Sequence, residues 1–385
     1  MIEEEFMRGN FKEALHMINQ ERLVERFLKY VQIDSETRNE KAFSEVLVKE
    51  LTDMGIEVIR DNAGTPVGSN TDNIIARLKG STDQPSIMFS SHMDTVSPGN
   101  GIKPVVENGI IKTDGTTVLG GDDKAGIAAI IEAFQTLIEA GTAHGDVEAI
   151  ITIAEEGGLN GSKNLDYSLV NSKFGFVLDS GGKTGEVIVQ GPAQDKIDVT
   201  ITGKPAHAGV EPEKGISAIM VASEAISNMK LLRIDEETTA NIGVIEGGQV
   251  TNIVCPEVTI KAEARSLSNE KLDAQSAHMA KCFEDAAEKF GGKATVEIER
   301  AYSAFLVNEN DEIITVIKKA MTAVGAKTNL TTSGGGSDTN IYNGNGIKAI
   351  NLGIGMQKVH TCDEFIAIED LVKSTELVAE IIKNV

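Results

Sequence analysis

Seven histidine, aspartate and glutamate residues could together form a metal site. Four of them directly follow an apolar run that indicates a strand, and each group comes with glycines or a turn. Imidazole and carboxylate ligands without cysteine suit zinc, and also cobalt or manganese, at a hydrolytic site. The seven residues are His92, Asp122, Asp123, Glu155, Glu156, Asp179 and His360.

A site of this composition could hold two metal ions about 3.5–4 Å apart that share one carboxylate. A separate carboxylate would then be needed as general base. The adjacent pair Glu155-Glu156 fits this division, because neighbouring residues on a turn face different ways. One of them can bind metal while the other reaches a water molecule. Metal charge would keep the ligating carboxylates ionised.

His92 and Asp94 stand two residues apart at the end of an apolar run that begins at Ser86. The period-two alternation of a strand points both side chains the same way. A histidine that ligates metal usually donates from its other ring nitrogen to a carboxylate or a carbonyl. His92 and Asp94 could be such a pair. Alone, the pair is better explained as a surface histidine after a strand, and only the downstream residues favour the metal site.

The composition excludes several classes of function. The length of 385 residues favours two domains. A formal net charge of −22 argues against nucleic acid or an anionic membrane as partner. We see no apolar run that could span a bilayer and no signal-peptide core. Three cysteines without pairing spacing indicate reduced thiols and a cytoplasmic location. The first 20 residues are polar with a helical pattern, and Met17 is an alternative start.

Strands that alternate with helices predict an α/β domain whose polar residues gather beyond strand ends. This domain covers residues 1–191 and resumes over residues 304–385. The expected strands are 56–59, 73–78, 84–90, 147–154, 173–178, 186–190 and 347–353, with a hairpin over 104–113. The expected helices are 23–31, 40–54, 127–140, 311–324 and 369–383, and residues 61–73 read as a loop.

The order of strand and helix patterns changes over residues 192–303, which predicts a second, inserted domain. Their elements follow the order β-α-β-β-α-β, which is the ferredoxin-like unit. The expected strands are 197–202, 239–245, 251–265 and 294–300, and the expected helices are 215–232 and 270–290.

Five sequence blocks resemble the co-catalytic zinc metallopeptidase family that includes tripeptidase T, aminoacylase and succinyl-diaminopimelate desuccinylase. They occur in the family's order and at family-like spacing over nearly the whole chain. The tripeptidase T branch is the most similar. The blocks are His92-Met93-Asp94-Thr95, Gly121-Asp122-Asp123-Lys124-Ala125-Gly126, Glu155-Glu156-Gly157, Asp179, and His360 with Glu364.

This resemblance implies a mixed-sheet α/β zinc-exopeptidase domain with an inserted ferredoxin-like lid domain, and two zinc ions per chain. Asp122 would bridge the two ions. His92 and Asp179 would complete one site, and Glu156 and His360 the other.

The resemblance also implies roles around the metals. Glu155 would be the general base that takes a proton from the bridging water, and Asp94 would orient His92. The peptide bond between Asp122 and Asp123 would be cis, which outside proline persists only where the surroundings enforce it.

Five further residues match positions that contact substrate in relatives. His207 resembles a lid histidine that steadies the oxyanion, a contribution commonly worth a few kcal/mol. Asn252 and Arg265 match substrate-holding positions, and an arginine fork suits a carboxylate. Gly335 belongs to a glycine-rich substrate loop, and Asp338 could bind a free peptide amino group. Relatives often pair as homodimers through the inserted domain.

Simpler interpretations stand beside these assignments. Asp122 and Asp123 could cap the helix that follows them. The Glu155-Glu156 pair could be a solvated acidic turn in an acid-rich chain, and Asp179 could belong to an ordinary turn. The run of glycines before Ser337 lacks the Gly-Lys-Ser/Thr ending of a phosphate loop.

The leading hypothesis is a two-zinc exopeptidase that hydrolyses short peptides, most like a tripeptidase that removes the N-terminal residue. An amidohydrolase or carboxypeptidase acting on N-acyl amino acids or dipeptides would use the same metals, with Arg265 for the substrate carboxylate. A non-catalytic, metal-bound peptide-binding protein is the alternative of another class. In such a protein we would expect Glu155 to be replaced, and it is present.

Overall fold

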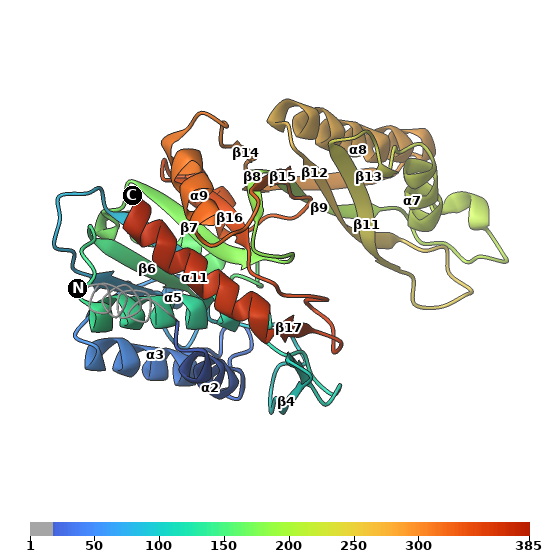
Figure 1. Cartoon of the computed structure of the whole chain (residues 1–385). Coiled ribbons are helices and arrows are strands. Elements are labelled where there is room, and N and C mark those ends of the chain that lie inside the picture. Colours follow the sequence, from blue (N-terminus) through green and yellow to red (C-terminus); the bar gives the residue numbers. More distant parts are fainter. Residues whose placement is uncertain (1–17) are drawn as a thin grey trace, which may run out of the picture. The chain divides into compact units, whose positions relative to one another are not determined.

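The computed structural model describes residues 18–385, so the pattern expected before Ile18 and the alternative start at Met17 lie outside the described residues. The described chain divides into two compact units (Figure 1). The first unit contains the chain up to Val189, Val307–Thr332 and Ser337–Val385, and the inserted unit contains Gln190–Leu306 and Ser333–Gly336. The sequence placed the inserted domain at 192–303 and left the segment 333–336 in the first domain. The structure assigns that segment to the inserted unit.

Eight strands of a nine-stranded mixed sheet begin in the described part of the first unit, while the ninth, β14, and the last two residues of β8 belong to the inserted unit (Figure 1). The strands are β1 (Glu57–Arg60), β2 (Ile74–Leu78), β3 (Ile87–His92), β6 (Val147–Thr152), β7 (Phe174–Ser180), β8 (Glu186–Gly191), β14 (Phe305–Leu306), β15 (Asn329–Thr332) and β16 (Lys348–Gly353). Their order is β1-β2-β6-β3-β7-β16-β8-β14, and β15 pairs with β8. Strands β6, β3, β7 and β16 are adjacent and parallel. Their carboxyl ends therefore meet at one edge of the sheet, where sites in α/β folds form.

Both faces of these central strands are apolar, as expected when helices cover a parallel sheet on both sides. Every residue of β3 and β6 is buried. Phe89 stacks on Phe176 with ring centroids 5.6 Å apart, and Ser90, on the opposite face, shares a 2.7 Å hydrogen bond with Tyr342. The helices of this unit are α2 (Gln20–Val31), α3 (Lys41–Asp53), α4 (Gly64–Val67), α5 (Gly121–Ala140), α6 (Asn160–Lys163), α9 (Glu312–Ala323), α10 (Asp338–Gly344) and α11 (Ile368–Asn384). The short helix α4 falls in the segment that the sequence predicted as a loop.

Helix α5 is buried around most of its circumference and packs against α2, α11 and β3. Its Glu132 is fully buried, and Arg22 and Arg26 of α2 both bind its carboxylate. A buried carboxylate that loses its partner costs about 3–5 kcal/mol. These ion pairs therefore tie α2 to the helix whose first residues include Asp122 and Asp123.

A small antiparallel sheet lies near the C-terminal helix. It contains β4 (Pro104–Glu107), β5 (Ile110–Thr113) and β17 (Phe365–Ala367) in the order β17-β5-β4. The hairpin predicted over 104–113 is confirmed, with its turn at Asn108-Gly109.

The inserted unit has an antiparallel sheet in the order β10-β11-β12-β9-β13, and helices α7 and α8 pack on it. Its elements are β9 (Ala193–Thr202), α7 (Ala218–Ser227), β10 (Leu232–Arg233), β11 (Thr238–Gly247), β12 (Glu257–Ser266), α8 (Asn269–Phe290) and β13 (Lys293–Tyr302). Apart from the short β10, this is the expected β-α-β-β-α-β order. The strand expected over 251–265 begins only at Glu257, because Pro256 has no N–H to donate and the residues before it turn.

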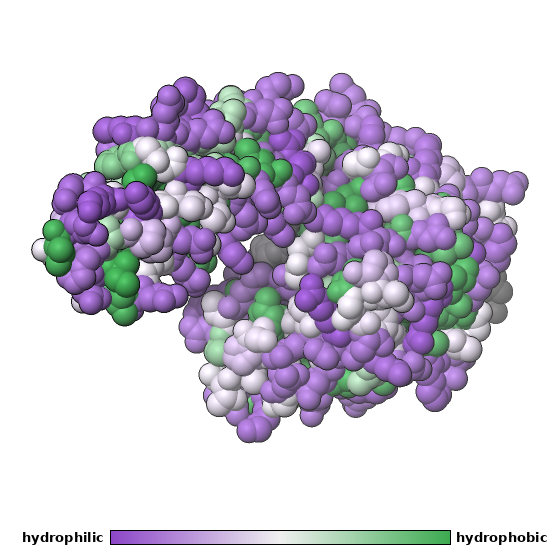
Figure 2. Space-filling model, turned by 180° about the vertical axis from the view of Figure 1, so that it is seen from behind, coloured by the Kyte–Doolittle hydropathy of each residue, from purple (hydrophilic) through white to green (hydrophobic). Residues whose placement is uncertain are grey.

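Hydrophilic residues cover most of the face drawn in Figure 2, and hydrophobic residues form smaller patches between them. This agrees with the strongly acidic composition. Among residues 18–385, no helix is both long enough and apolar enough to cross a membrane.

Candidate metal centre

Side chains that follow the adjacent parallel strands converge at one edge of the sheet. Each stands at or after the carboxyl end of its strand, and the first residues of α5 meet them there. Together they bring His92 from β3, Glu155 and Glu156 from the turn after β6, Asp179 from β7, His360 from the loop after β16, and Asp122 from α5.

The carboxylate of Asp122 lies between two imidazoles. Its Oδ1 is 3.1 Å from His92 Nε2, and its Oδ2 is 3.2 Å from His360 Nε2. Asp179 Oδ1 lies 3.8 Å from His92 Nε2, and Glu156 Oε1 lies 2.9 Å from His360 Nε2. Ligand atoms that sit about 2.0–2.1 Å from a tetrahedral zinc are roughly 3.4 Å apart. The spacing therefore fits two metal groups that share one carboxylate.

The donor set itself favours a bound cation. Oε1 of Glu156 is buried, and although it lies 2.9 Å from His360 Nε2, it receives no hydrogen bond of good geometry from the part of the chain that the structure describes. Two triplets of ligand atoms each lie within 4.8 Å of one another, one from His92, Asp122 and Glu156 and the other from His92, Asp123 and Asp179. So many carboxylates at short range repel one another unless positive charge lies between them.

Asp123 is one of the seven candidate residues but not one of the ligands that the family resemblance implies, although it belongs to one of these triplets. Its Oδ1 accepts a 3.3 Å hydrogen bond from the Gly126 N–H, and its Oδ2 accepts a 3.4 Å bond from the His92 N–H. The backbone is non-helical at Asp122 and Asp123, so Asp123 acts as the N-cap of the regular part of α5. The predicted cis peptide bond between the two aspartates is confirmed.

The pKa values of the carboxyl groups in this cluster are shifted in opposite directions. Burial raises the pKa of Asp179 to about 7, and burial together with the charge of Asp179 raises the pKa of Glu155 well above its usual range. Burial acts in the same direction on Asp122, but hydrogen bonds from His360 and His92 outweigh it and lower the Asp122 pKa. The close carboxylates of Asp122 and Glu156 raise the pKa of His360 to about 10. Of Asp122, Glu155 and Asp179, Asp122 is therefore the one held in its ionised form.

Asp94 contacts His92 as expected, but more closely through its main-chain carbonyl than through its carboxylate. Its Nδ1 lies 2.9 Å from the main-chain carbonyl oxygen of Asp94 and 3.5 Å from the carboxylate. With Nδ1–H donating to the carbonyl, Nε2 is left to face Asp122 and Asp179. The main chain of Asp94 therefore orients His92, because its carboxylate is turned towards other donors.

Those donors are the backbone amides of the Glu155-Glu156 turn. Oδ1 of Asp94 accepts a 2.9 Å hydrogen bond from the Glu155 N–H, and Oδ2 accepts bonds from the Glu156 N–H at 3.2 Å and from the Thr37 hydroxyl at 2.8 Å. Asp94 is completely buried. One aspartate therefore fixes the strand end that carries His92 and the turn that carries both glutamates.

Sequence reasoning missed Asn351, which holds Asp179 in place. Its side-chain oxygen accepts a 3.1 Å bond from the Asp179 N–H, and its amide donates a 2.9 Å bond to the Asp179 carbonyl. The available signal was a single polar residue in the apolar run that forms β16.

The prediction that Asp338 binds a free amino group is corrected by the structure. Asp338 is buried, its Oδ1 accepts a hydrogen bond from the Ser162 hydroxyl, and its Oδ2 accepts one from the Thr152 hydroxyl at 2.6 Å. With both oxygens occupied inside the core, this carboxylate ties α10 to β6 and α6 rather than facing substrate.

The other predicted substrate residues lie in the inserted unit. Ala208 follows His207, and its N–H donates to the Asn252 carbonyl at 2.9 Å. His207 and Asn252 are therefore neighbours. Arg265 lies on β12 and makes two bonds to the carboxylate of Glu263, at 3.0 and 3.1 Å. Gly335 lies in the segment 333–336, where its N–H donates to the Ser333 hydroxyl at 3.0 Å. A substrate carboxylate would have to compete with Glu263 for Arg265.

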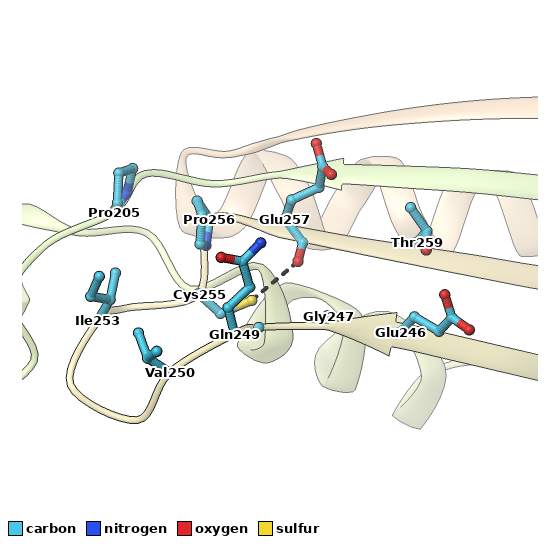
Figure 3. A pocket seen from close by; sticks show the side chains of 11 residues that line it. Pro205, Glu246, Gly247, Gln249, Val250, Ile253, Cys255, Pro256, Glu257 and Thr259 are labelled. Atoms are coloured by element: carbon cyan, nitrogen blue, oxygen red, sulfur yellow. Dashed lines mark hydrogen bonds between the residues drawn. The ribbon is translucent and has the colours of Figure 1, made fainter.

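A pocket of about 420 Å³ lies entirely within the inserted unit (Figure 3). The Cys255 thiol beside it donates a 3.1 Å hydrogen bond to the Glu257 carbonyl. None of the predicted catalytic, metal or substrate residues lines it. The lining residues are Pro205, Glu246, Gly247, Gly248, Gln249, Val250, Ile253, Cys255, Pro256, Glu257 and Thr259.

Comparison with known proteins identifies the family. The model of peptidase family M20/M25/M40 matches residues 88–384. The chain belongs to this peptidase family. It is 53% identical over 368 residues to the uncharacterized protein YqjE of Bacillus subtilis. The match covers 96% of this chain and 99% of that protein.

Two solved structures are similar over nearly their whole length. The aminopeptidase PepT of Bacillus cereus is 50% identical with a TM-score of 0.90, and the match covers 96% of this chain and 99% of that one. A tripeptidase of Staphylococcus aureus is 42% identical with a TM-score of 0.93, and the match covers 95% and 98% of the two chains. The mixed α/β architecture expected from the sequence is thus shared with solved members of the family.

The contacts of Asp94 predict a strong effect of the substitution Asp94→Asn. The amide would keep one acceptor oxygen but would turn an NH2 group towards a backbone N–H, so the turn that carries both glutamates should loosen. We expect peptide hydrolysis, measured as kcat/KM, to fall about 10–100-fold.

The matched control is Thr37→Val, which removes one donor to the same carboxylate and leaves both backbone bonds in place. Its effect should stay below about tenfold. An Asp94→Asn enzyme with the activity and metal content of the wild type would show that the carboxylate does not organise the turn.

Proposed function

We propose that the protein is a two-zinc aminopeptidase that removes the N-terminal residue from short peptides, tripeptides foremost. One observation carries the hydrolytic chemistry: the two oxygens of Asp122 face two separate histidine–carboxylate pairs. The substrate class is supported by the whole-length likeness to an aminopeptidase and a tripeptidase.

The donor groups suit zinc, and cobalt or manganese could replace it. His92 and Asp179 would hold one ion, Glu156 and His360 the other, and Asp122 both. Bound metal ions supply water activation and polarisation of the scissile carbonyl.

Glu155 is proposed as the general base and acid. It stands next to the ligand Glu156 but is not needed to complete either metal group, and its backbone is held by Asp94. Its raised pKa suits a carboxyl group that accepts a proton from water and then delivers it to the leaving amine. Proton transfer of this kind typically contributes about 10²–10⁴-fold to the rate.

In the inserted unit, His207 and Asn252 form one proposed substrate group, because the N–H of Ala208, the residue after His207, donates to the Asn252 carbonyl. His207 would donate to the developing oxyanion. Arg265 and Gly335 are proposed to contact the remainder of the peptide. The pairing of Arg265 with Glu263 leaves its guanidinium less available to a free carboxylate, which favours the aminopeptidase over an N-acyl amino acid hydrolase.

A panel of one tripeptide in free, N-acetylated and C-amidated forms distinguishes the two hydrolases. Because an aminopeptidase requires a free amino group, the free and amidated peptides should be cleaved and the acetylated one should not, as followed by chromatography of the products. Cleavage of the acetylated but not the amidated peptide would establish the amidohydrolase or carboxypeptidase instead.

The same assay tests the non-catalytic alternative. Glu155→Gln should lower kcat about 10²–10⁴-fold with the metal content unchanged. Wild-type protein that is fully loaded with metal and cleaves none of the peptides would support a binding protein. Activity that survives Glu155→Ala would remove Glu155 from its proposed role.

We also propose that the chain forms a homodimer through the inserted domain. Exposed large apolar side chains concentrate there, and such residues mark interaction surfaces when they gather. They include Val210, Ile219, Met220, Leu232, Val244, Ile245, Val250 and Ile253.

Analytical ultracentrifugation should give the dimer mass, and Met220→Asp on α7 should shift it towards the monomer. A monomer mass for the wild type at micromolar concentration would contradict the proposal.

A cytoplasmic location is proposed from the cysteines. Cys255, Cys282 and Cys362 are all free, which is usual for proteins kept in a reducing compartment.

A further inference from the structure

Glu364 is a buried carboxylate beside the turn that leads into α5. It lies immediately before β17 and is 2% exposed. Its Oε2 accepts hydrogen bonds from the backbone N–H groups of Leu119 at 2.7 Å and Gly120 at 2.9 Å, and its Oε1 accepts one from the Asp122 N–H at 2.9 Å. One side chain therefore binds three backbone donors within four consecutive residues.

These donors need a partner from outside the helix. The first N–H groups of a helix have no intrahelical acceptor, and the backbone at Asp122 and Asp123 departs from helical angles. A carboxylate at this position satisfies the orphan donors and interacts favourably with the positive end of the helix dipole. The main chain of Asp122 is thereby fixed from one side by Glu364.

Gly121 makes room for this contact. A Cβ atom at Gly121 would lie 2.9 Å from Oε1 of Glu364, which is closer than such atoms approach in proteins. A glycine between Gly120 and Asp122 therefore allows the carboxylate to reach all three amides.

The same loop also carries His360. The loop is closed by two hydrogen bonds between Gln357 and Phe365, at 3.0 and 3.1 Å, and the Glu364 N–H donates to the Thr361 carbonyl at 3.1 Å. One compact loop thus presents an imidazole to the Asp122 carboxylate and a carboxylate to the Asp122 main chain.

We propose that Glu364 is a positioning residue for the metal centre. It fixes the main chain of Asp122 so that one carboxylate oxygen faces His92 and the other faces His360. The inference rests on the proposed two-metal site.

The test compares Glu364→Gln with Asp363→Asn. Glutamine keeps one acceptor oxygen and turns an NH2 group towards backbone donors, so the Asp122 turn should shift. Asp363 undergoes the same change of charge on the same loop, but its side chain is 80% exposed and contacts Lys358.

Zinc affinity would be measured on metal-stripped protein by chelator competition, and the ligand geometry by the visible absorption of the Co²⁺-loaded protein. Glu364→Gln should weaken zinc binding about 10–100-fold and change the Co²⁺ spectrum. Excess zinc should restore much of its activity, which it could not do for a misfolded enzyme. Asp363→Asn should match the wild type in all three measurements.

Gly121→Ala tests the contact from the other side. Alanine is the better helix former, yet its methyl group should displace the Glu364 carboxylate and weaken zinc binding in the same direction. The Gly121→Ala variant decides whether the contact positions Asp122 if Glu364→Gln fails to fold, as judged by circular dichroism.

Zinc affinity within about twofold of the wild type in the folded variants would overturn the proposal. A wild-type protein that binds two metals but cleaves no peptide would refute the proposed function, while the affinity comparison would still decide the role of Glu364.

Discussion

The shared position of the Asp122 carboxylate, between His92 and His360, is the constraint on which the rest of the centre depends. The two oxygens lie 3.1 and 3.2 Å from the two imidazoles. An aspartate side chain has few torsions, so the position of its carboxylate follows that of its main chain. The two oxygens can therefore face both partners only if the main chain is held rigidly. Asp123 caps α5 on one side, Glu364 binds the preceding amides on the other, and the ion pairs of Glu132 fasten α5 to α2.

The surrounding sheet brings several carboxylates together at one edge despite their like charges. Parallel strands β6, β3, β7 and β16 deliver their following residues to the same edge, so ligands far apart in the sequence meet without long loops. The carboxylates are then fixed through their main chains, as Asp94 does for Glu155 and Glu156 and Asn351 does for Asp179. Backbone anchoring leaves the carboxylate oxygens free to face cations, which explains why so few of the anchoring contacts use them.

Much of the fold could be predicted from periodicity, because the buried strands are continuous apolar runs and the helices are amphipathic or wholly apolar. The β-α-β-β-α-β insertion was evident for the same reason. The predictions were weakest where tertiary contacts decide. The strand expected from Thr251 begins only at Glu257, after Pro256, and the glycine-rich segment 333–336 belongs to the inserted unit although the sequence gives no sign of it.

The same limit applies to the site. The identities of the proposed ligands followed from residue types at strand ends and from the family resemblance. The donors to the carboxylates of Asp94 and Asp338 were not foreseen, because they come from residues 57 to 186 positions away in the chain. Asn351 and Glu364 bind backbone amides, and spacing alone does not reveal such a contact.

The most direct test of the account is the metal stoichiometry at saturating zinc, measured by mass spectrometry of the dialysed protein. The wild type should bind two ions per chain, and Asp122→Asn should weaken both, because each ion would use one oxygen of the same carboxylate. No more than one ion in the wild type, or two tightly bound ions in Asp122→Asn, would contradict the shared carboxylate.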